Sequence, residues 1–244
     1  MFEPRLALAS LSGESDAEWA RAGAKYAGAA FLGGLALDEP TREAARTMVA
    51  DRDREEFLPP DPFAFLREQL ALLEGVSVTP GFNVRATDTG PIRRAARICA
   101  DRDAILEINA HCRQDEMCSV GAGESLLQDP DRFVEQVAAA HETGATVSVK
   151  VRTEVPGVDL PALAARLDDA GADVVHVDAM DSEGVVADVV RATDAFVVAN
   201  NGVRDARTTR EYLAYGADAV SVGRPSDDPT VLSRVAATVA EWFE

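Results

Sequence analysis

The chain has very little lysine. Its 244 residues include 24 lysines and arginines, of which only Lys25 and Lys150 are lysines, against 42 aspartates and glutamates, for a net charge of −18. An acidic, lysine-poor surface stays hydrated at high salt, where screening weakens its self-repulsion, so we expect a halophilic protein. The same charge opposes binding to a polyanion at low salt.

Cysteine and long apolar runs are also scarce. The three cysteines, Cys99, Cys112 and Cys118, are an odd number in a chain without an export signal, so we expect reduced thiols. His111 lies beside Cys112, but no further cluster completes a zinc site, and we expect no metal. No basic leader and no run of ~18 apolar residues occur, which predicts a cytoplasmic protein without a membrane span.

Eight short runs rich in Val, Ile, Leu and Ala indicate strands, each followed by an amphipathic segment. They begin at Leu6, Ala29, Val76, Ala104, Thr146, Asp173, Ala195 and Asp218. This alternation predicts an α/β fold, a (β/α)8 TIM barrel, as a single domain over residues 1–244. Residues 38–62 are longer than one connection needs, so we expect an insertion there and the second helix at Phe63. One helix follows the eighth strand, so we expect no further domain.

Polar residues gather where six of these strands end. In a closed barrel all such ends meet at one mouth, which is where barrel active sites lie. The residues are Asn83; Asn109, His111 and Cys112; Lys150 and Arg152; His176 and Asp178; Asn200, Asn201 and Gly202; and Gly223 and Arg224.

Lys150 carries the most information, because a chain that avoids lysine keeps one at the end of an apolar strand. The position favours a ligand contact, although a lysine whose side chain extends from a strand end into water would give the same sequence pattern. The turns NNGV and GRP, after the seventh and eighth strands, are suited to bind phosphate through backbone N–H groups and Arg224.

The motifs INAHC, GAGESLL, SVKVR, VVHVDA, VVANNGV and AVSVGRP occur in this order between Val76 and Asp228. Their order and spacing resemble those of tRNA-dihydrouridine synthases, with their blocks N-x-G-C-P, G-x-G-A-x-L-L, V-K-x-R, V-H-G-R, I-x-N-G-D-I and M-x-G-R-x. The resemblance implies an FMN-binding barrel oxidoreductase that uses NADPH or NADH as electron donor. Its substrate would be a tRNA uridine or a small molecule with a uracil-like ring.

The resemblance also implies roles for single residues. Lys150 and Asn83 would contact the flavin ring, and Asn201, Gly202, Gly223 and Arg224 would hold the FMN phosphate. Cys112 would protonate C5 of uracil as hydride reaches C6, because a thiol has a suitable pKa for proton donation. Asn109, Arg152 and His176 would line the substrate side, and His176 and Lys150 would join Cys112 in catalysis.

Three departures separate the chain from the family pattern. The Gly-Cys-Pro turn reads His111-Cys112-Arg113, the arginine of V-H-G-R is absent from VVHVDA, and no Pro-Met pair follows the first strand. The helical C-terminal domain that grips tRNA in the family is also missing.

These departures leave three alternatives open. One is a flavin barrel like dihydroorotate dehydrogenase that acts on a free pyrimidine. Another is a flavin-free, phosphate-binding isomerase or synthase in which Lys150 is acid, base or Schiff-base nucleophile. A third is a non-enzymatic relative, because fold alone does not determine function.

Overall fold

The computed structural model describes residues 1–51 and 55–244. Residues 52–54 belong to the segment 38–62 that the sequence assigns to an insertion, and this part of that prediction lies outside the described residues.

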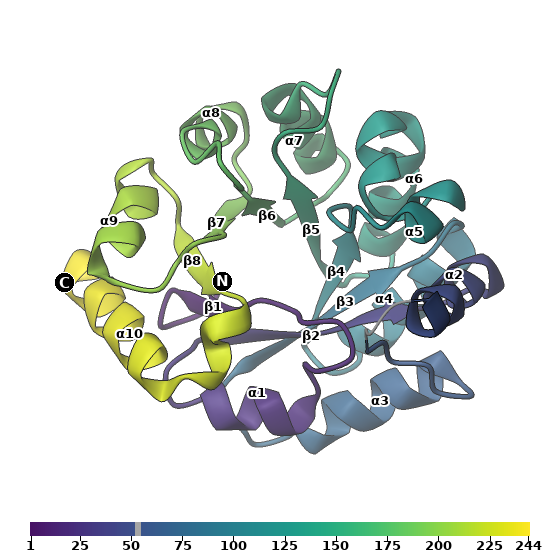
Figure 1. Ribbon diagram of the computed structural model, residues 1–244, viewed down its shortest axis with the longest axis horizontal. Helices are drawn as coiled ribbons and strands as arrows, with labels where there is room; N and C mark the ends of the chain where they lie inside the picture. Colours follow the sequence, from purple (N-terminus) through teal and green to yellow (C-terminus); the bar gives the residue numbers. More distant parts are fainter. Residues whose placement is uncertain (52–54) are drawn as a thin grey trace.

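Eight parallel strands close into a barrel, and each pairs with the next strand in sequence until β8 pairs with β1 (Figure 1). Every run that the sequence assigned to a strand forms one, so the predicted (β/α)8 fold is confirmed. The strands are β1 (Leu6–Leu8), β2 (Ala29–Ala36), β3 (Thr79–Arg85), β4 (Ile105–Asn109), β5 (Thr146–Arg152), β6 (Val174–Asp178), β7 (Phe196–Asn200) and β8 (Ala219–Val222).

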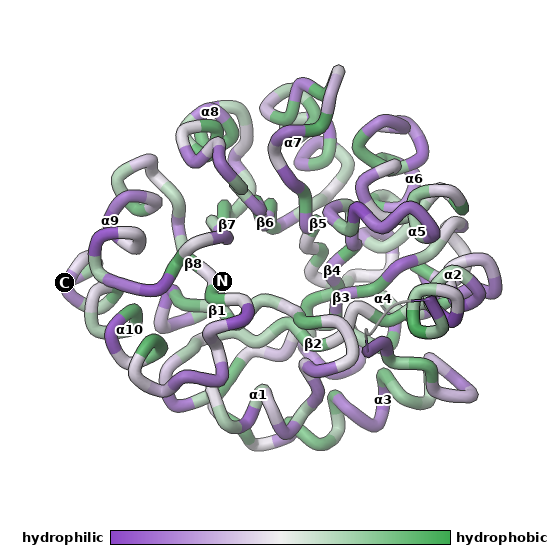
Figure 2. Tube along the Cα trace, in the orientation of Figure 1, coloured by the Kyte–Doolittle hydropathy of each residue, from purple (hydrophilic) through white to green (hydrophobic). Residues whose placement is uncertain are grey.

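Helices surround the barrel and alternate hydrophobic with hydrophilic residues along their length (Figure 2). The α-helices are α1 (Ala17–Gly23), α2 (Glu39–Asp51), α3 (Pro62–Leu72), α4 (Thr89–Ala100), α5 (Asp115–Ser119), α6 (Pro130–His141), α7 (Leu160–Asp169), α8 (Val185–Ala192), α9 (Ala206–Ala214) and α10 (Pro229–Phe243). Two short 3₁₀ helices are η1 (Gly123–Gln128) and η2 (Arg224–Asp227). None of the helices in the described part of the chain is long and apolar enough to cross a membrane.

Aspartate begins many of these helices. The side chains of Asp61, Asp129, Asp159, Asp205 and Asp228 each accept a hydrogen bond from a backbone N–H in the first turn of α3, α6, α7, α9 and α10. Proline is the first residue of α3, α6 and α10 and the second residue of α7. Its fixed φ and missing N–H suit the first turn of a helix. The caps fix the ends of the loops that lead from each strand into its helix.

Helix α2 was not anticipated from the sequence. The segment predicted as an insertion contains the 13-residue helix α2. The buried residues Ala44, Ala45 and Met48 of α2 pack in one apolar cluster with Met117 of α5 and with Cys112. The helix α8 carries the apolar sequence VVADVVRA, whose short, Val-rich pattern is typical of a strand as much as of a helix.

The barrel interior changes from apolar to polar along the strands. At the amino-terminal ends of the strands, an apolar cluster includes Phe31, Ile105, Val174 and Val198. The next inward positions carry polar side chains that are fully buried, namely Asn83, Glu107, Ser148, His176 and Ser221. Barrels of this type usually fill such layers with Val, Ile and Leu, so a polar middle layer indicates a special requirement close to the mouth.

Candidate active site

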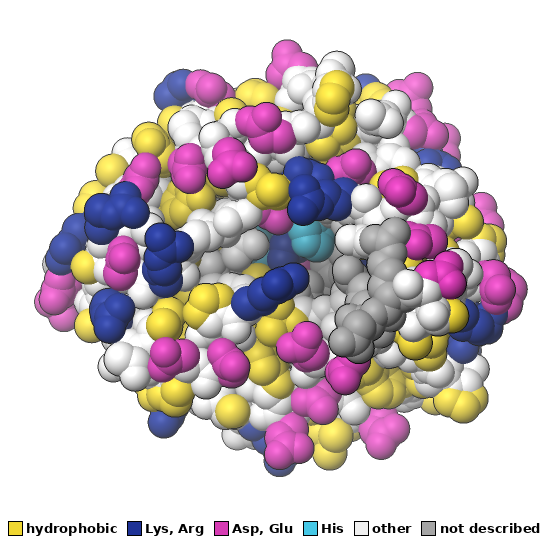
Figure 3. All heavy atoms as spheres, in the orientation of Figure 1, with side chains coloured by type: hydrophobic (Ala, Val, Ile, Leu, Met, Phe, Trp, Pro, Cys, Tyr) yellow, Lys and Arg dark blue, Asp and Glu magenta, His cyan; other side chains and the backbone are white. Residues whose placement is uncertain are grey.

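A cavity of about 1360 Å³ occupies the mouth of the barrel, at the carboxyl ends of the strands. Figure 3 shows this hollow at the centre of the face, with basic and histidine side chains inside it. Among the described residues that line the cavity, six are basic, namely Arg85, Arg113, Lys150, Arg152, Arg204 and Arg224, and three are acidic, namely Glu14, Glu55 and Asp178. On a chain with a net charge of −18, this local excess of positive charge favours an anionic ligand.

Lys150 lies near the floor of the cavity. Along β5, Val147, Val149 and Val151 pack in the outer core, and the alternation of strand residues therefore directs Lys150 inward. Its side chain is 2% exposed, and no described residue accepts a hydrogen bond from its Nζ atom. Burial lowers the pKa of Lys150, and the negative charges of Glu107 and Asp178 offset part of that effect.

Glu107 is the centre of the buried polar layer. Its Oε1 atom accepts a hydrogen bond from Asn83 Nδ2 at 2.7 Å, and Oε2 accepts from Ser148 Oγ at 3.0 Å. His176 Nδ1 lies 2.7 Å from the same Oε2 atom, and His176 Nε2 lies 2.8 Å from Ser221 Oγ. These contacts join five strands across the inside of the barrel.

The pKa values of this layer favour an ionised carboxylate beside a neutral imidazole. Burial raises the pKa of Glu107, but the charges and hydrogen bonds contributed by His176, Lys150 and Asn83 outweigh burial, so the pKa lies below its usual value. Burial lowers the pKa of His176, and its contact with Glu107 only partly opposes this. With three donors around one carboxylate, the buried charge is well compensated.

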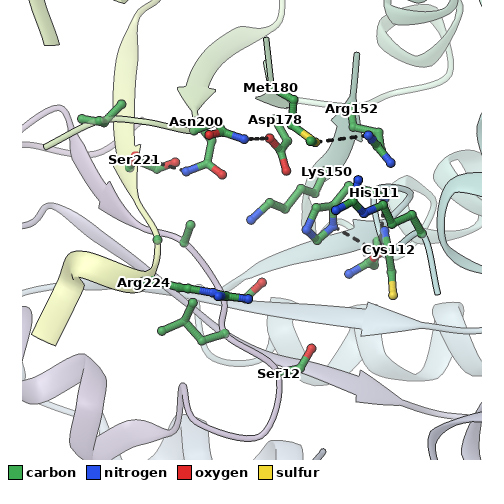
Figure 4. A pocket seen from close by; sticks show the side chains of 18 of the residues that line it. Ser12, His111, Cys112, Lys150, Arg152, Asp178, Met180, Asn200, Ser221 and Arg224 are labelled. Carbon is green, nitrogen blue, oxygen red and sulfur yellow. Dashed lines mark hydrogen bonds between the residues drawn. The ribbon is translucent and has the colours of Figure 1, made fainter. Parts of the chain in front are cut away.

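The loop after β4 brings three predicted residues to the mouth. Asn109 Oδ1 accepts hydrogen bonds from the backbone N–H groups of His111 at 3.3 Å and Cys112 at 3.1 Å. The His111 imidazole lies beside the Lys150 side chain in Figure 4. Cys112 lines the cavity but is 7% exposed, and its side chain also packs in the apolar cluster with Met48 and Met117.

His111 stands where the dihydrouridine synthase pattern has glycine, and its ring is held without a charge. Burial holds the pKa of His111 well below its usual range, and the positive charges of Lys150, Arg85 and Arg152 lower it further. The ring therefore enters the cavity as a neutral imidazole at neutral pH.

Arg152 is held at the edge of the cavity by an ion pair. Its Nη1 atom lies 2.7 Å from Glu124 Oε2 of η1, and its Nη2 atom lies 3.1 Å from Met180 Sδ. Figure 4 shows Arg152 and Met180 together above Lys150. The guanidinium of Arg152 is thus fixed in orientation close to the loop that carries Cys112.

The ends of β7 and β8 form the opposite wall. Asn201 and Gly202 both have positive φ angles, of 93° and 67°, and the Asn201 side chain donates to Asp178 Oδ1 at 2.8 Å. A side-chain carbon placed on Gly202 or Gly223 would have nothing within 4 Å, so a ligand can approach the backbone at both turns. Arg224 enters the cavity from this wall in Figure 4.

A second buried ion pair closes the β2–β3 side of the mouth. Arg85, the last residue of β3, pairs with Glu56 at 2.8 Å, and both side chains are 1% exposed. The Arg85 guanidinium also donates a hydrogen bond to Ser12 in the loop after β1. A side-chain carbon on Gly34 would collide with the Arg85 guanidinium, so this packing requires glycine at position 34.

The structure brings most of the predicted site residues to one cavity and places two of them beneath it. The cavity is lined by Asn109, Cys112, Lys150, Arg152, Asn201, Gly202, Gly223 and Arg224. Asn83 and His176 are fully buried one layer below, within the network around Glu107. Sequence reasoning missed Glu107, Ser221 and Arg85. Each lies two residues from a predicted residue or glycine, which is the spacing of strand residues that face the same side.

Comparison with known proteins decides the family. The family model described as dihydrouridine synthase (Dus) matches residues 83–243, which is more than half of the chain. The chain belongs to the dihydrouridine synthase family. This confirms the resemblance drawn from the motifs between Val76 and Asp228. An uncharacterized protein of Methanocaldococcus jannaschii is similar to this family member, with 26% identity over 236 residues, 91% of this chain and 89% of that protein.

Solved structures share the fold of this dihydrouridine synthase family member at low identity. A mutant FabK from Thermotoga maritima has a TM-score of 0.62 and 16% identity over 92% of this chain, which spans only 63% of FabK. The tryptophan synthase complex from Pyrococcus furiosus has a TM-score of 0.60 and 14% identity, over 100% of this chain and 99% of that one. These likenesses show the barrel fold alone.

Proposed function

We propose that this chain is an FMN-dependent oxidoreductase that reduces the C5–C6 double bond of a uracil-like ring, with NADPH or NADH as electron donor. The observation that carries the proposal is the pairing of Lys150 with the β7–β8 wall in one cavity. The Lys150 side chain is 2% exposed, lines the cavity and donates no hydrogen bond to a described residue, and Arg224 and two open glycine turns face the same space. A planar ring joined to a phosphate matches such a site.

The residues present fit FMN. The backbone at Gly202 and Gly223 is open to close approach, and Arg224 supplies a positive charge beside it, so these turns would hold the phosphate. Asn201, whose side chain is tied to Asp178, would complete this end of the site.

Lys150 would contact the flavin ring. A buried ammonium without an acceptor is costly, and a ring carbonyl or nitrogen would supply the missing partner. When bound, FMN would accept a hydride from the nicotinamide donor and pass it to C6 of the uracil-like ring. Asn83 and His176 support this region from below through Glu107 rather than from the cavity wall.

Reduction of the ring also requires a proton at C5. We assign this proton to Cys112, which lines the cavity at the position of the cysteine in the family motif. The Asn109 side chain fixes the backbone of Cys112, and Arg152 lies nearby at the edge, where it would meet the carbonyl groups or phosphate of the substrate. Negative charge that builds on the ring as hydride arrives would be neutralised by the thiol proton.

Substrates of two sizes suit this cavity, a uridine within tRNA and a free pyrimidine. Family membership supports the tRNA uridine. The net charge of −18 favours the smaller substrate at low salt, because it repels a polyanion, whereas the basic cavity attracts single anionic groups.

A titration with FMN in about 2 M KCl, a concentration that screens surface charge strongly, tests the proposal. We expect a change in the flavin absorbance spectrum and a rise in melting temperature for the wild type and for Lys25→Met, which removes the other, exposed lysine. Lys150→Met and Arg224→Ala should each weaken FMN binding. If FMN neither binds nor stabilises the wild type, the flavin function is wrong, and a phosphate-binding isomerase or synthase becomes the better explanation.

Turnover would then identify the substrate. With FMN and NADPH present, reduction of C5–C6 removes the ultraviolet absorbance of the uracil ring. Unmodified tRNA, uridine 5′-monophosphate and orotate should be compared at equal concentration in high salt. Loss of uracil absorbance with tRNA alone would establish RNA modification. Loss of absorbance with a free nucleotide or base alone would establish a pyrimidine reductase.

A further inference from the structure

A chain of hydrogen bonds runs from the buried carboxylate of Glu107 to the imidazole of His111 at the mouth. Asn83 Nδ2 donates to Glu107 Oε1 at 2.7 Å, and Asn109 Nδ2 donates to Asn83 Oδ1 at 2.8 Å. The last link joins His111 Nδ1 to Asn109 Oδ1 at 3.3 Å. Two strands, β3 and β4, and the loop after β4 contribute to this relay.

The direction of the relay is fixed at its buried end. An ionised carboxylate only accepts hydrogen bonds, so Asn83 must present its amide nitrogen to Glu107 and its oxygen to Asn109. Asn109 must then present its nitrogen to Asn83. Because all three side chains are at most 2% exposed, water is not available to satisfy a reversed amide.

The direction is fixed a second time at the mouth. The oxygen of Asn109 also accepts from the backbone N–H groups of His111 and Cys112, and a backbone N–H is always a donor. Both ends therefore place an acceptor opposite His111 Nδ1. A neutral imidazole has one N–H group, so the proton resides on Nδ1 and the lone pair on Nε2.

We propose that His111 Nε2 is a hydrogen-bond acceptor presented to the cavity, where it binds the N–H of a cyclic imide. This specificity rests on the proposed function, because it names the part of the ring that the site reads. The cationic side chains that act on His111 include Lys150, Arg85 and Arg152, and each of these is a hydrogen-bond donor only. A ring N–H between two carbonyl groups complements one acceptor surrounded by donors.

Two rings of the proposed reaction carry this imide, the uracil-like substrate and the flavin. Both have N–H at position 3 between two carbonyl groups. The neighbouring cations keep His111 neutral, which preserves its lone pair. His111, which stands at the glycine position of the family motif, thereby recognises one of these rings.

Nitrogen-15 NMR of histidine-labelled protein measures the tautomer directly, without any ligand. The chain has three histidines, His111, His141 and His176, and single substitutions to Gln assign their signals. We expect His111 to be protonated on Nδ1 and not on Nε2 at neutral pH. A proton on Nε2, or on both nitrogens, overturns the proposal whatever the enzyme's activity.

Glu107→Gln tests the origin of the tautomer. Glutamine can donate as well as accept, so the buried end no longer fixes the relay, and only the backbone N–H groups of His111 and Cys112 still hold the Asn109 oxygen toward Nδ1. The fraction of His111 that is protonated on Nε2 should therefore rise. Ser148→Ala is the matched control, because it removes a hydrogen bond to Glu107 Oε2 but leaves the Asn83 link at Oε1 intact. Identical His111 signals in wild type and Glu107→Gln would show that the carboxylate does not set the direction, although the acceptor itself would remain established.

Ligand probes then identify the imide. We expect the Nε2 signal of His111 to shift on addition of FMN alone or of uridine 5′-monophosphate, and the ring that shifts it is the one recognised. The N3-methylated counterpart of that ring lacks the N–H and should bind about 3- to 10-fold more weakly, as expected for loss of one neutral hydrogen bond, without shifting Nε2. Equal shifts from both forms, or none from any, overturn the proposed recognition. An intact FMN complex together with an Nε2 signal that responds to neither FMN nor uridine 5′-monophosphate leaves the proposed function standing and refutes only this inference.

Discussion

Glu107 Oε2 lies 2.7 Å from His176 Nδ1, and neither side chain has any exposed surface. The carboxylate thereby sets the tautomer of a second histidine, since an Nδ1–H donor on His176 leaves Nε2 to accept from Ser221 Oγ. A single buried carboxylate thus orders both histidines at the centre of the barrel. Removal of this carboxylate should therefore lower the stability of the fold and disturb the hydrogen bonds of the site.

Glu107→Leu should lower the free energy of unfolding by about 3–5 kcal/mol, because Asn83, Ser148 and His176 all lose their acceptor and Lys150 loses a nearby negative charge. Ser148→Ala removes one donor and should cost only about 0.5–1.5 kcal/mol. Denaturant unfolding in high salt measures both. Equal effects of the two substitutions would contradict a central role for the carboxylate.

A different prediction concerns the ion pair Arg85–Glu56, in which both charged side chains are buried. Glu56→Leu leaves the Arg85 guanidinium buried without its ion pair and should cost about 3–5 kcal/mol. The double variant Arg85→Met with Glu56→Leu should recover most of that loss, since neither charge remains to be compensated. A double-mutant cycle by denaturant unfolding measures the coupling, and a double variant as unstable as the sum of the two single variants would refute it.

The sequence was sufficient to predict the eight strands because each is a short apolar run followed by an amphipathic segment. It also located Lys150, Arg224 and the two glycine turns, because residues at the ends of parallel strands share one edge. The sequence did not reveal Glu107 or Arg85, since a charged residue inside a strand reads as solvent-exposed until its partners are known. Those partners lie 24 to 69 residues away from Glu107 and 29 residues away from Arg85.

The position of His176 shows the same limit. Its motif placed it at the substrate side, but the register sets it beside Lys150 on the neighbouring strand, one layer deeper than the cavity wall. Helix α2 could not be anticipated for another reason. Its buried face meets Met117 and Cys112, which are distant in sequence, and its charged residues suggested a solvated loop.

Stability should fall as the pH is lowered through the range below 6.5. The pKa values of His111 and His176 are lowered in the fold, chiefly by burial, so the unfolded chain binds protons there that the folded chain does not. Each histidine contributes at most about 1.4 kcal/mol per pH unit. The difference in unfolding free energy between wild type and His111→Gln should therefore shrink by up to this amount per unit below 6.5. A difference that is independent of pH would show that His111 titrates normally.

Folding should also depend on salt, because a net charge of −18 on 244 residues repels itself when the Debye length is about 10 Å or more. We expect the melting temperature to rise steeply between about 0.1 and 2 M KCl, over which the Debye length becomes very short. Sucrose at equal osmolality is the control, since it stabilises folded proteins without screening charge. An unchanged melting temperature across this range would exclude a halophilic adaptation.

The assignment of Cys112 as proton donor predicts a separation of binding from turnover. Cys112→Ala should bind FMN as the wild type does, because no contact with the phosphate or the ring of FMN is assigned to the thiol. It should lower the rate of ring reduction by about 10²- to 10⁴-fold, the usual contribution of a general acid.

The substitution also removes a sulfur from the cluster with Met48 and Met117, so unfolding measurements must accompany the kinetics. Cys118→Ala, in the adjacent helix α5, removes a thiol that donates to the Cys112 carbonyl, and it is the matched control that should retain turnover. If Cys112→Ala turned over at the wild-type rate with unchanged stability, the thiol would be a packing residue. Proton donation would then fall to another group at the mouth. His111 is unsuited to that task, because its Nδ1 proton is engaged by Asn109 and its Nε2 atom carries a lone pair.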